Sequence, residues 1–179
     1  MPATGHLLLT PAAPVVALTR LASGVGALTI EVAVPRGAAE VRLGCAYTLA
    51  SGQESFVDSA AGAPAGSPRP PVAGGRDRIT LDLRQVRDLA RALLVVQAVA
   101  HAPATWDAML VLTTHAGSRI DVPLASAPSS VAVAAVSLAQ VRGEIVVRAE
   151  LDPADSARAA CAAFGYEAIS WLDNATALS

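Results

Sequence analysis

"RALLVVQAVAH", residues 91–101, is the stretch that decides the fold. Between Arg91 and His101 its side chains are apolar on both of the faces that alternate along a strand, apart from Gln97. A strand with apolar side chains on both faces has to be covered on both sides. The pattern therefore predicts a central strand over Ala92–His101.

Similar short runs, rich in Val and bounded by Gly, Pro or Ser, recur along the rest of the chain. In "ALTIEVAV", residues 27–34, every second residue from Leu28 to Val34 is apolar, which is typical of a half-buried strand. Many short strands at this spacing predict an all-β fold, a two-sheet antiparallel β-sandwich. The other strands are expected at His6–Thr10, Val15–Leu21, Ala27–Val34, Ala39–Thr48, Ile79–Leu83, Ala108–Thr113, Arg119–Leu124, Val131–Ala139 and Glu144–Glu150.

One short C-terminal helix is expected over Pro153–Ala163. Asp152 can cap its first turn, Pro153 is tolerated at its first position, and Gly165 can end it. The stretch 60–75 consists mainly of Gly, Pro, Ala and Ser, so we expect a mobile surface loop there. We divide the chain into a sandwich domain, 1–165, and a C-terminal tail, 166–179.

The composition excludes several classes of partner. Hydrophobic residues make up 53 % of the chain but aromatic residues only 3 %, so the core must consist of Val, Leu, Ile and Ala. A net charge of -2 gives no electrostatic footprint for nucleic acid. The apolar run 92–100 is far shorter than the roughly 20 residues of a membrane helix. With no basic leader, and with Cys45 and Cys161 expected as reduced thiols, the sequence predicts a cytoplasmic protein.

No catalytic motif stands out. His6, His101 and His115 are too far apart in sequence for a zinc signature, and neither cysteine has a second ligand nearby. The chain contains no Gly-x-Ser-x-Gly elbow, so a hydrolase is the least favoured class. We expect no catalytic residues and no cofactor.

The acidic residues of "GGRDRITLDLRQV", residues 74–86, admit two interpretations. Asp77 and Asp82 belong either to a metal site or to the solvated face of a strand. Calcium takes six to eight oxygen ligands, several of them anionic, and Asp77 lies between Arg76 and Arg78. The residues therefore favour the solvated strand.

The tryptophans suggest one packing role and one surface role. Trp106 in "HAPATWDA" is expected to anchor a connection between strands. Trp171 lies in the tail, where neither a strand nor a short helix separates apolar from polar residues cleanly. Tryptophan and tyrosine are frequent in protein interfaces. Two interpretations of the tail stay open: Trp171 docks on the core of its own domain, or Tyr166, Trp171 and Leu172 contact a protein partner or a second copy of the chain.

The order of segments in the C-terminal half resembles the tellurium-resistance (TerD-like) stress-response family. The family's Ile-x-Val-Asp-Leu strand is matched by Ile79, Leu81, Asp82 and Leu83, and its strand ending in Ile-His by Ala100-His101. Its Gly-Glu-Trp-x-Phe-Arg-Ala hairpin corresponds to residues 143–149, and its Phe-Gly-Val-x-Val segment to 164–168.

The resemblance implies a two-sheet sandwich that binds calcium through Asp-rich loops. In the first of these loops only Glu54 and Asp58 are acidic, and in the second Asp77 stands alone. We therefore expect Asp58, Asp77 and Asp82 to be relics of a calcium site that no longer works.

The resemblance also implies a non-enzymatic binding or scaffold module of a bacterial tellurium-resistance-type stress response. Its partner is expected to be a protein or a second copy in a homo-oligomer. The alternative is a self-assembling structural β-sandwich that packs edge to edge.

Overall fold

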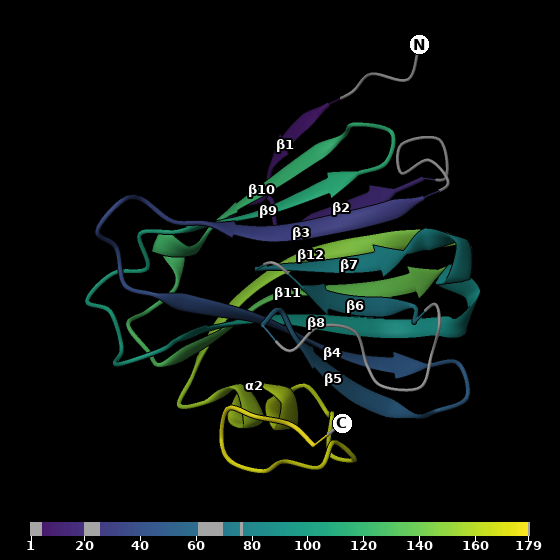
Figure 1. Cartoon of the computed structure of the whole chain (residues 1–179). Helices are drawn as coiled ribbons and strands as arrows, with labels where there is room; N and C mark the ends of the chain where they lie inside the picture. The colour runs from purple at the N-terminus through teal and green to yellow at the C-terminus, as the bar shows by residue number, and fades with distance from the viewer. Residues whose placement is uncertain (1–4, 20–25, 61–69, 76, 179) are drawn as a thin grey trace.

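Two six-stranded sheets pack face to face in the computed structural model, which describes residues 5–19, 26–60, 70–75 and 77–178 (Figure 1). Sheet I has the order β1-β10-β9-β3-β7-β6, and sheet II the order β2-β12-β11-β8-β4-β5. Neighbouring strands are antiparallel except β1, which runs parallel to β10. The predicted antiparallel β-sandwich is confirmed. Its elements are β1 (His6–Leu8), β2 (Val15–Leu18), β3 (Ala27–Ala33), β4 (Val41–Leu49), β5 (Glu54–Asp58), β6 (Val72–Gly75), β7 (Arg78–Asp82), η1 (Leu83–Asp88), β8 (Leu89–Ala98), β9 (Met109–Thr114), β10 (Arg119–Pro123), η2 (Leu124–Ser126), β11 (Ala132–Val141), β12 (Glu144–Ala154) and α2 (Ala157–Ala163).

The predicted central strand is β8, which lies between β11 and β4. Its two faces belong to different cores. Leu94 and Val96 point between the sheets, into a core built from both of them. Leu93 and Val95 point to the outer face of sheet II, where they pack with residues of α2 and the tail. Burial on both faces explains why this segment is apolar throughout.

The C-terminal helix is shorter than expected, because β12 continues to Ala154 and the helix begins at Ala157. Strand β2 pairs with β12 only from Ile145 to Arg148. Pro153 therefore lies where that edge of β12 has no neighbouring strand, and the missing N–H of proline leaves no bond to such a strand unmade. The cap is Ser156 instead of Asp152, since its Oγ accepts a hydrogen bond from the Ala159 N–H at 3.0 Å. Gly165, with φ of 75°, follows the helix as predicted.

Two strands, β5 and β6, are absent from the sequence prediction. Strand β6 corrects the end of the expected loop over 60–75, since Val72 to Gly75 pair with β7 and Val72 is fully buried; residues 61–69 lie outside the described part of the chain. Gly74 explains the close contact between β6 and β5, because a Cβ there would lie 2.2 Å from the Asp58 carbonyl oxygen. A segment with two glycines has no alternation for a sequence pattern to detect.

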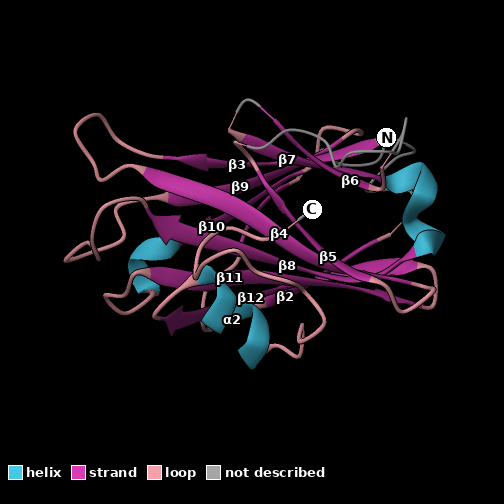
Figure 2. Ribbon diagram, turned by 60° about the horizontal axis from the view of Figure 1, so that its bottom comes forward, coloured by secondary structure: helices cyan, strands magenta, loops and turns pink. Residues whose placement is uncertain are grey.

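The outer face of sheet II carries α2 and the tail, whereas sheet I lies on its other side (Figure 1). Helix α2 packs against β8, β11 and β12 (Figure 2). Its buried residues Ala157, Ala160 and Cys161 are small, so the helix lies close to the sheet. Within the described ranges, no helix has the length and apolar character to cross a membrane.

Candidate functional site

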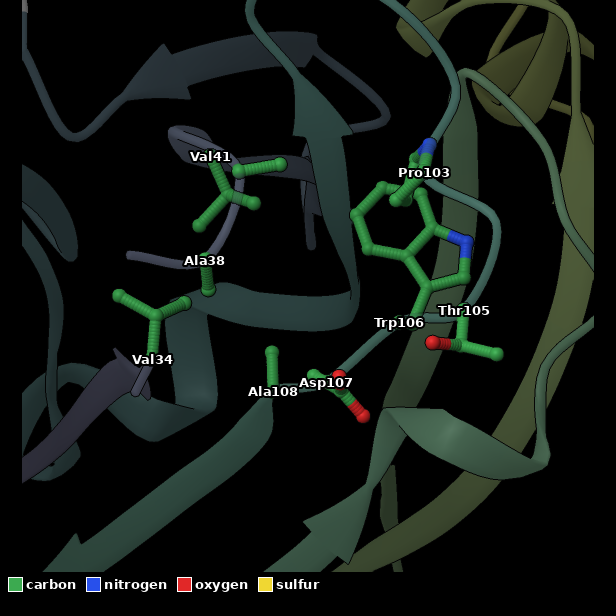
Figure 3. A pocket seen from close by; sticks show the side chains of 9 residues that line it. Val34, Ala38, Val41, Pro103, Thr105, Trp106, Asp107 and Ala108 are labelled. Carbon is green, nitrogen blue, oxygen red and sulfur yellow. The ribbon is translucent and has the colours of Figure 1, made fainter. Parts of the chain in front are cut away.

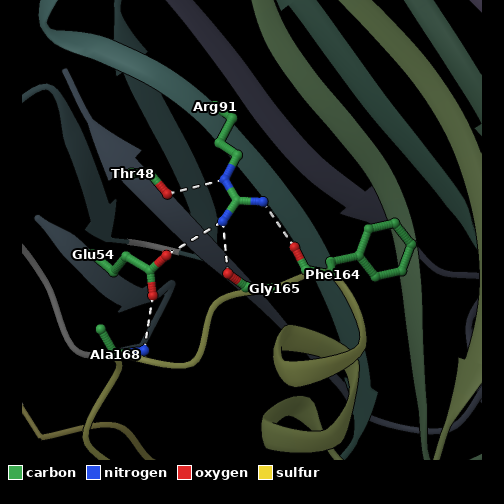
Figure 4. A network of polar contacts seen from close by, with 6 residues as sticks. All are labelled: Thr48, Glu54, Arg91, Phe164, Gly165 and Ala168. Carbon is green, nitrogen blue, oxygen red and sulfur yellow. Dashed lines mark hydrogen bonds and ion pairs between the residues drawn. The ribbon is translucent and has the colours of Figure 1, made fainter. Parts of the chain in front are cut away.

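Arg91 lies at the centre of a polar cluster on the outer face of sheet II (Figure 4). Its Nε donates to Thr48 Oγ1 at 3.1 Å, and Nη2 donates to Glu54 Oε1 at 3.3 Å. It also donates to the carbonyl oxygens of Phe164, at 2.8 Å, and Gly165, at 2.7 Å. The last carbonyls of a helix have no partner within the helix, so Arg91 satisfies the C-terminal end of α2.

The same cluster holds the start of the tail. Glu54, whose side chain is 11 % exposed, accepts from the Ala168 N–H through Oε2 at 2.9 Å. The Arg91 guanidinium carbon lies 4.2 Å from the centre of the Tyr166 ring, within the range of a cation–π contact. Arg91 and Glu54 thus fix α2, Tyr166 and Ala168 to sheet II.

The tail packs on the sandwich itself, which is one of the two arrangements that the sequence left open. Tyr166 and Ile169 are buried, so Tyr166 contacts its own chain and is not free for a partner. Trp171 is half-buried, with its ring centre 5.0 Å from that of Phe56. Leu172, by contrast, is 70 % exposed. Of Tyr166, Trp171 and Leu172, Leu172 alone is classed as exposed.

A short closed loop presents Leu172. Trp171 and Ala177 form a β-bridge, and the Leu172 N–H donates to the Thr176 carbonyl at 2.9 Å. Asp173 Oδ1 accepts from the backbone N–H groups of Ala175 and Thr176, which lowers the pKa of its carboxyl. The loop therefore holds an exposed leucine on an ordered backbone.

The three aspartates expected to be relics of a calcium site have structural roles. Asp58 Oδ1 accepts from the Ala60 N–H at 2.7 Å, as in an Asx turn. Asp77 has φ of 61° in the tight turn of the β6–β7 hairpin, a conformation that Asp tolerates better than most residues. Asp82 caps η1 by accepting from the backbone and side chain of Arg84 and from Gln85.

Asp77 and Asp82 also lie apart. Asp77 immediately precedes β7, and Asp82 is its last residue. A five-residue strand is about 16 Å long, so the strand separates the two carboxylates. The bonds from Arg84 to Asp82 lower the pKa of that carboxyl to about 2. The described residues contain no group of three His, Cys, Asp or Glu side chains that could hold a metal ion.

Both cysteines are free and buried. Burial, together with the nearby Glu54 carboxylate, raises the pKa of Cys161 to about 12, and burial likewise raises the pKa of Cys45. Burial also raises the pKa of the Tyr166 hydroxyl, more than the Arg91 charge lowers it. None of these groups is a ready nucleophile at neutral pH.

A cluster around Asp121 was not anticipated from the sequence. Asp121 is 5 % exposed on sheet I and accepts from His6 Nε2 and Arg119 Nε, both at 2.7 Å. Burial acts to raise the pKa of Asp121, but the bonds from Arg119 and His6 outweigh it and lower the pKa. His6 and Asp121 are far apart in sequence, so only the pairing of β1 with β10 brings them together.

Trp106 is an anchor between β8 and β9, as expected. Its side chain is 1 % exposed. It lines a small pocket together with Val34, Val41 and Pro103 (Figure 3). Its indole N–H has no hydrogen-bond partner among the described residues. At 70 Å³ the pocket has room for a few water molecules at most.

Comparison with known proteins gives the fold. No family model and no curated protein matches the chain. The structure of SAV2460, a protein of unknown function, matches with a TM-score of 0.55 and 17 % identity, over 78 % of this chain and 95 % of that one. A homologue of the telluride resistance protein TerD, SCO6318 from Streptomyces coelicolor A3(2), matches with a TM-score of 0.50 and 12 % identity, over 70 % of this chain and 88 % of that one. The chain therefore has a TerD-like fold.

Proposed function

We propose that this protein is a non-enzymatic binding module of the TerD type, which acts as a scaffold in a bacterial stress response of the tellurium-resistance kind. The observation that carries the proposal is the loop around Leu172. A leucine that is 70 % exposed on a backbone closed by its own hydrogen bonds is preformed for contact with a protein. Leu178, in the same tail, is 56 % exposed.

The chemistry of the described side chains supports a binding role over catalysis. The thiols and the Tyr166 hydroxyl have raised pKa values, and the aspartates Asp58 and Asp82 are engaged in a turn and a helix cap. We infer that calcium is not required for the function. Two free, buried cysteines also favour a reducing compartment, so we place the protein in the cytoplasm.

A photo-cross-linking amino acid at position 172 tests the proposal in cells. Position 141 is the matched control, because Val141 is also apolar and 47 % exposed but lies at the end of β11. We expect position 172 alone to cross-link one protein. With that protein purified, Leu172→Glu should weaken binding at least about tenfold and Val141→Glu should not. Equal cross-linking from both positions, or unchanged affinity of Leu172→Glu, would contradict the role of this loop.

Self-assembly is the second candidate, and the edges of the two sheets favour it. Strands β1 and β2 are edge strands, and Leu7, Leu8 and Val15 on them are 41 %, 53 % and 50 % exposed. Unpaired edges with apolar side chains can pair with another copy. Light scattering over a range of concentrations decides between the candidates. A large species that Val15→Lys dissociates would favour the structural protein, and a monomer at all concentrations would favour the scaffold.

A further inference from the structure

A groove of 500 Å³ lies between β12 and α2, a volume in the range of ordinary ligand sites. Alanines of β11, β12 and α2 line it, together with the half-buried ring of Phe164. The Phe164 carbonyl faces Arg91, whereas its ring points away from Arg91 (Figure 4). The charged residues that line the groove are Glu150 and Asp152, both carboxylates. The groove is therefore an apolar surface with a negative rim.

The two carboxylates reach this rim through an irregularity in β12. Ala134 pairs with Asp152 and Val136 with Ala149, so β12 has one more residue than β11 between these pairs. Leu151 takes up the extra length with φ of 56°, in the left-handed region that non-glycine residues seldom occupy. Leu151 is buried between the sheets, and Glu150 and Asp152 on either side of it line the groove. Bulges of this kind commonly reorient side chains beside binding sites.

The carboxylates differ in how far they are already engaged. Glu150 accepts from Ser137 Oγ at 2.5 Å and lies 3.3 Å from Arg148 Nε, so it is held in place and partly balanced. The carboxylate of Asp152 has no hydrogen bond or ion pair with any described residue. Asp152, which is exposed, lines one groove with the Phe164 ring and the alanine methyl groups. This combination fits a cation that is carried on an apolar stem.

Arginine fits these features better than lysine. Its flat guanidinium stacks on aromatic rings and binds carboxylates through two parallel donors. This chain already contains such an arrangement beyond the end of α2, where Arg91 lies over the Tyr166 ring and bonds to Glu54. Phe164 and Asp152 offer a second arginine the same two kinds of group.

We propose that this groove binds an arginine side chain presented by a segment of a partner protein. The proposal rests on the proposed function only in taking the partner to be a protein. The exposed loop of a second copy is a poor occupant, because Leu172 is followed by Asp173, which would bring a further negative charge to the rim.

A peptide titration of the full chain tests the groove. The probe is the acetylated and amidated pentapeptide Leu-Ser-Arg-Ser-Leu, and the comparison peptide carries citrulline, which is uncharged, in place of arginine. Chemical shifts of the isotope-labelled protein should move saturably at Ala134, Asp152 and Ala163. We expect the citrulline peptide to bind at least about tenfold more weakly, since charge-assisted hydrogen bonds are the stronger kind.

Two variants complete the experiment. Asp152→Asn should weaken binding of the arginine peptide about tenfold, whereas Asp155→Asn, at an exposed carboxylate outside the groove, should not change it. Unchanged melting temperatures exclude unfolding as the cause. The proposal is overturned if the two peptides bind equally, if Asp152→Asn has no effect, if the shifts map elsewhere, or if nothing binds at millimolar peptide. If the peptide fails while the cross-link at position 172 persists, the groove assignment falls and the scaffold role stands.

Discussion

Val95 and Val96 are neighbours on β8, yet they are buried in two different cores. Val96 lies between the sheets, and Val95 lies beneath α2 and the tail. Both are at most 1 % exposed. The sandwich therefore has three layers at this point, with β8 in the middle layer.

Substitution of Val96 by Asp tests this arrangement. The change places an unpaired charge between the sheets, so we expect the free energy of unfolding to fall by about 4 kcal/mol, or the protein not to fold. Val99→Asp is the control, because Val99 is 44 % exposed just beyond the end of β8. It should change stability by about 0.5 kcal/mol or less. Urea denaturation followed by circular dichroism measures both, and equal small effects would contradict the central position of β8.

Loss of the Arg91 guanidinium should loosen the tail. Arg91→Met removes four hydrogen bonds and leaves Glu54, 11 % exposed, without its cation. We expect a loss of about 2 to 3 kcal/mol in the free energy of unfolding. The Ala168 amide should also exchange its hydrogen faster. Arg87→Met, at an exposed residue of η1, is the matched control and should change neither quantity. An unaltered exchange rate in Arg91→Met would show that the tail is held by apolar packing alone.

Calcium should leave the melting temperature unchanged. A site with micromolar affinity would add roughly 4 kcal/mol of stability at a thousandfold excess of free ion. We expect no such gain, since Asp58, Asp77 and Asp82 lie in a turn, a hairpin and a helix cap. Differential scanning calorimetry at millimolar calcium, and again with chelator, is the measurement. A rise of several degrees that the chelator reverses would restore the calcium site.

Asp82 should contribute stability that depends on pH. Its pKa is about 2 in the folded protein, below the ordinary value of 3.8 for an aspartate in the unfolded chain. A lowered pKa means that the contribution is complete above about pH 4 and is lost as the pH falls towards 2. Asp82→Asn should therefore cost about 1 kcal/mol at neutral pH, after allowance for solvent screening, and only a small part of that at pH 2. A difference that does not change between pH 6 and pH 2 would contradict this role.

Strands with a continuous apolar pattern could be predicted from the sequence, and those shaped by their neighbours could not. Strand β8 could be predicted because the side chains on both of its faces are apolar. Strand β6 has two glycines and forms because β7 offers a partner and because Gly74 fits against the Asp58 carbonyl. The predicted helix start at Pro153 is wrong, because Pro153 belongs to β12. A proline is tolerated there because β2 is too short to cover this edge of β12, and the sequence does not show that length.

The polar clusters depend on tertiary structure in the same way. Arg91 contacts Glu54 and Gly165, and His6 contacts Asp121, across long stretches of chain. A signal for the first was present: an arginine near the start of a strand that is buried on both faces must find acceptors on a covered face. The acceptors themselves, two backbone carbonyls at a helix end, carry no mark in the sequence.

The order in which the chain is made gives the docked tail a further consequence. Ala46, Phe56, Leu93 and Val95 are all synthesised before α2 and the tail, which cover them. Until residues 157–178 have left the ribosome, the nascent sandwich exposes an apolar sheet face to other chains. Conditions that slow or halt translation prolong this exposure, so the newly made protein should then depend most on chaperones.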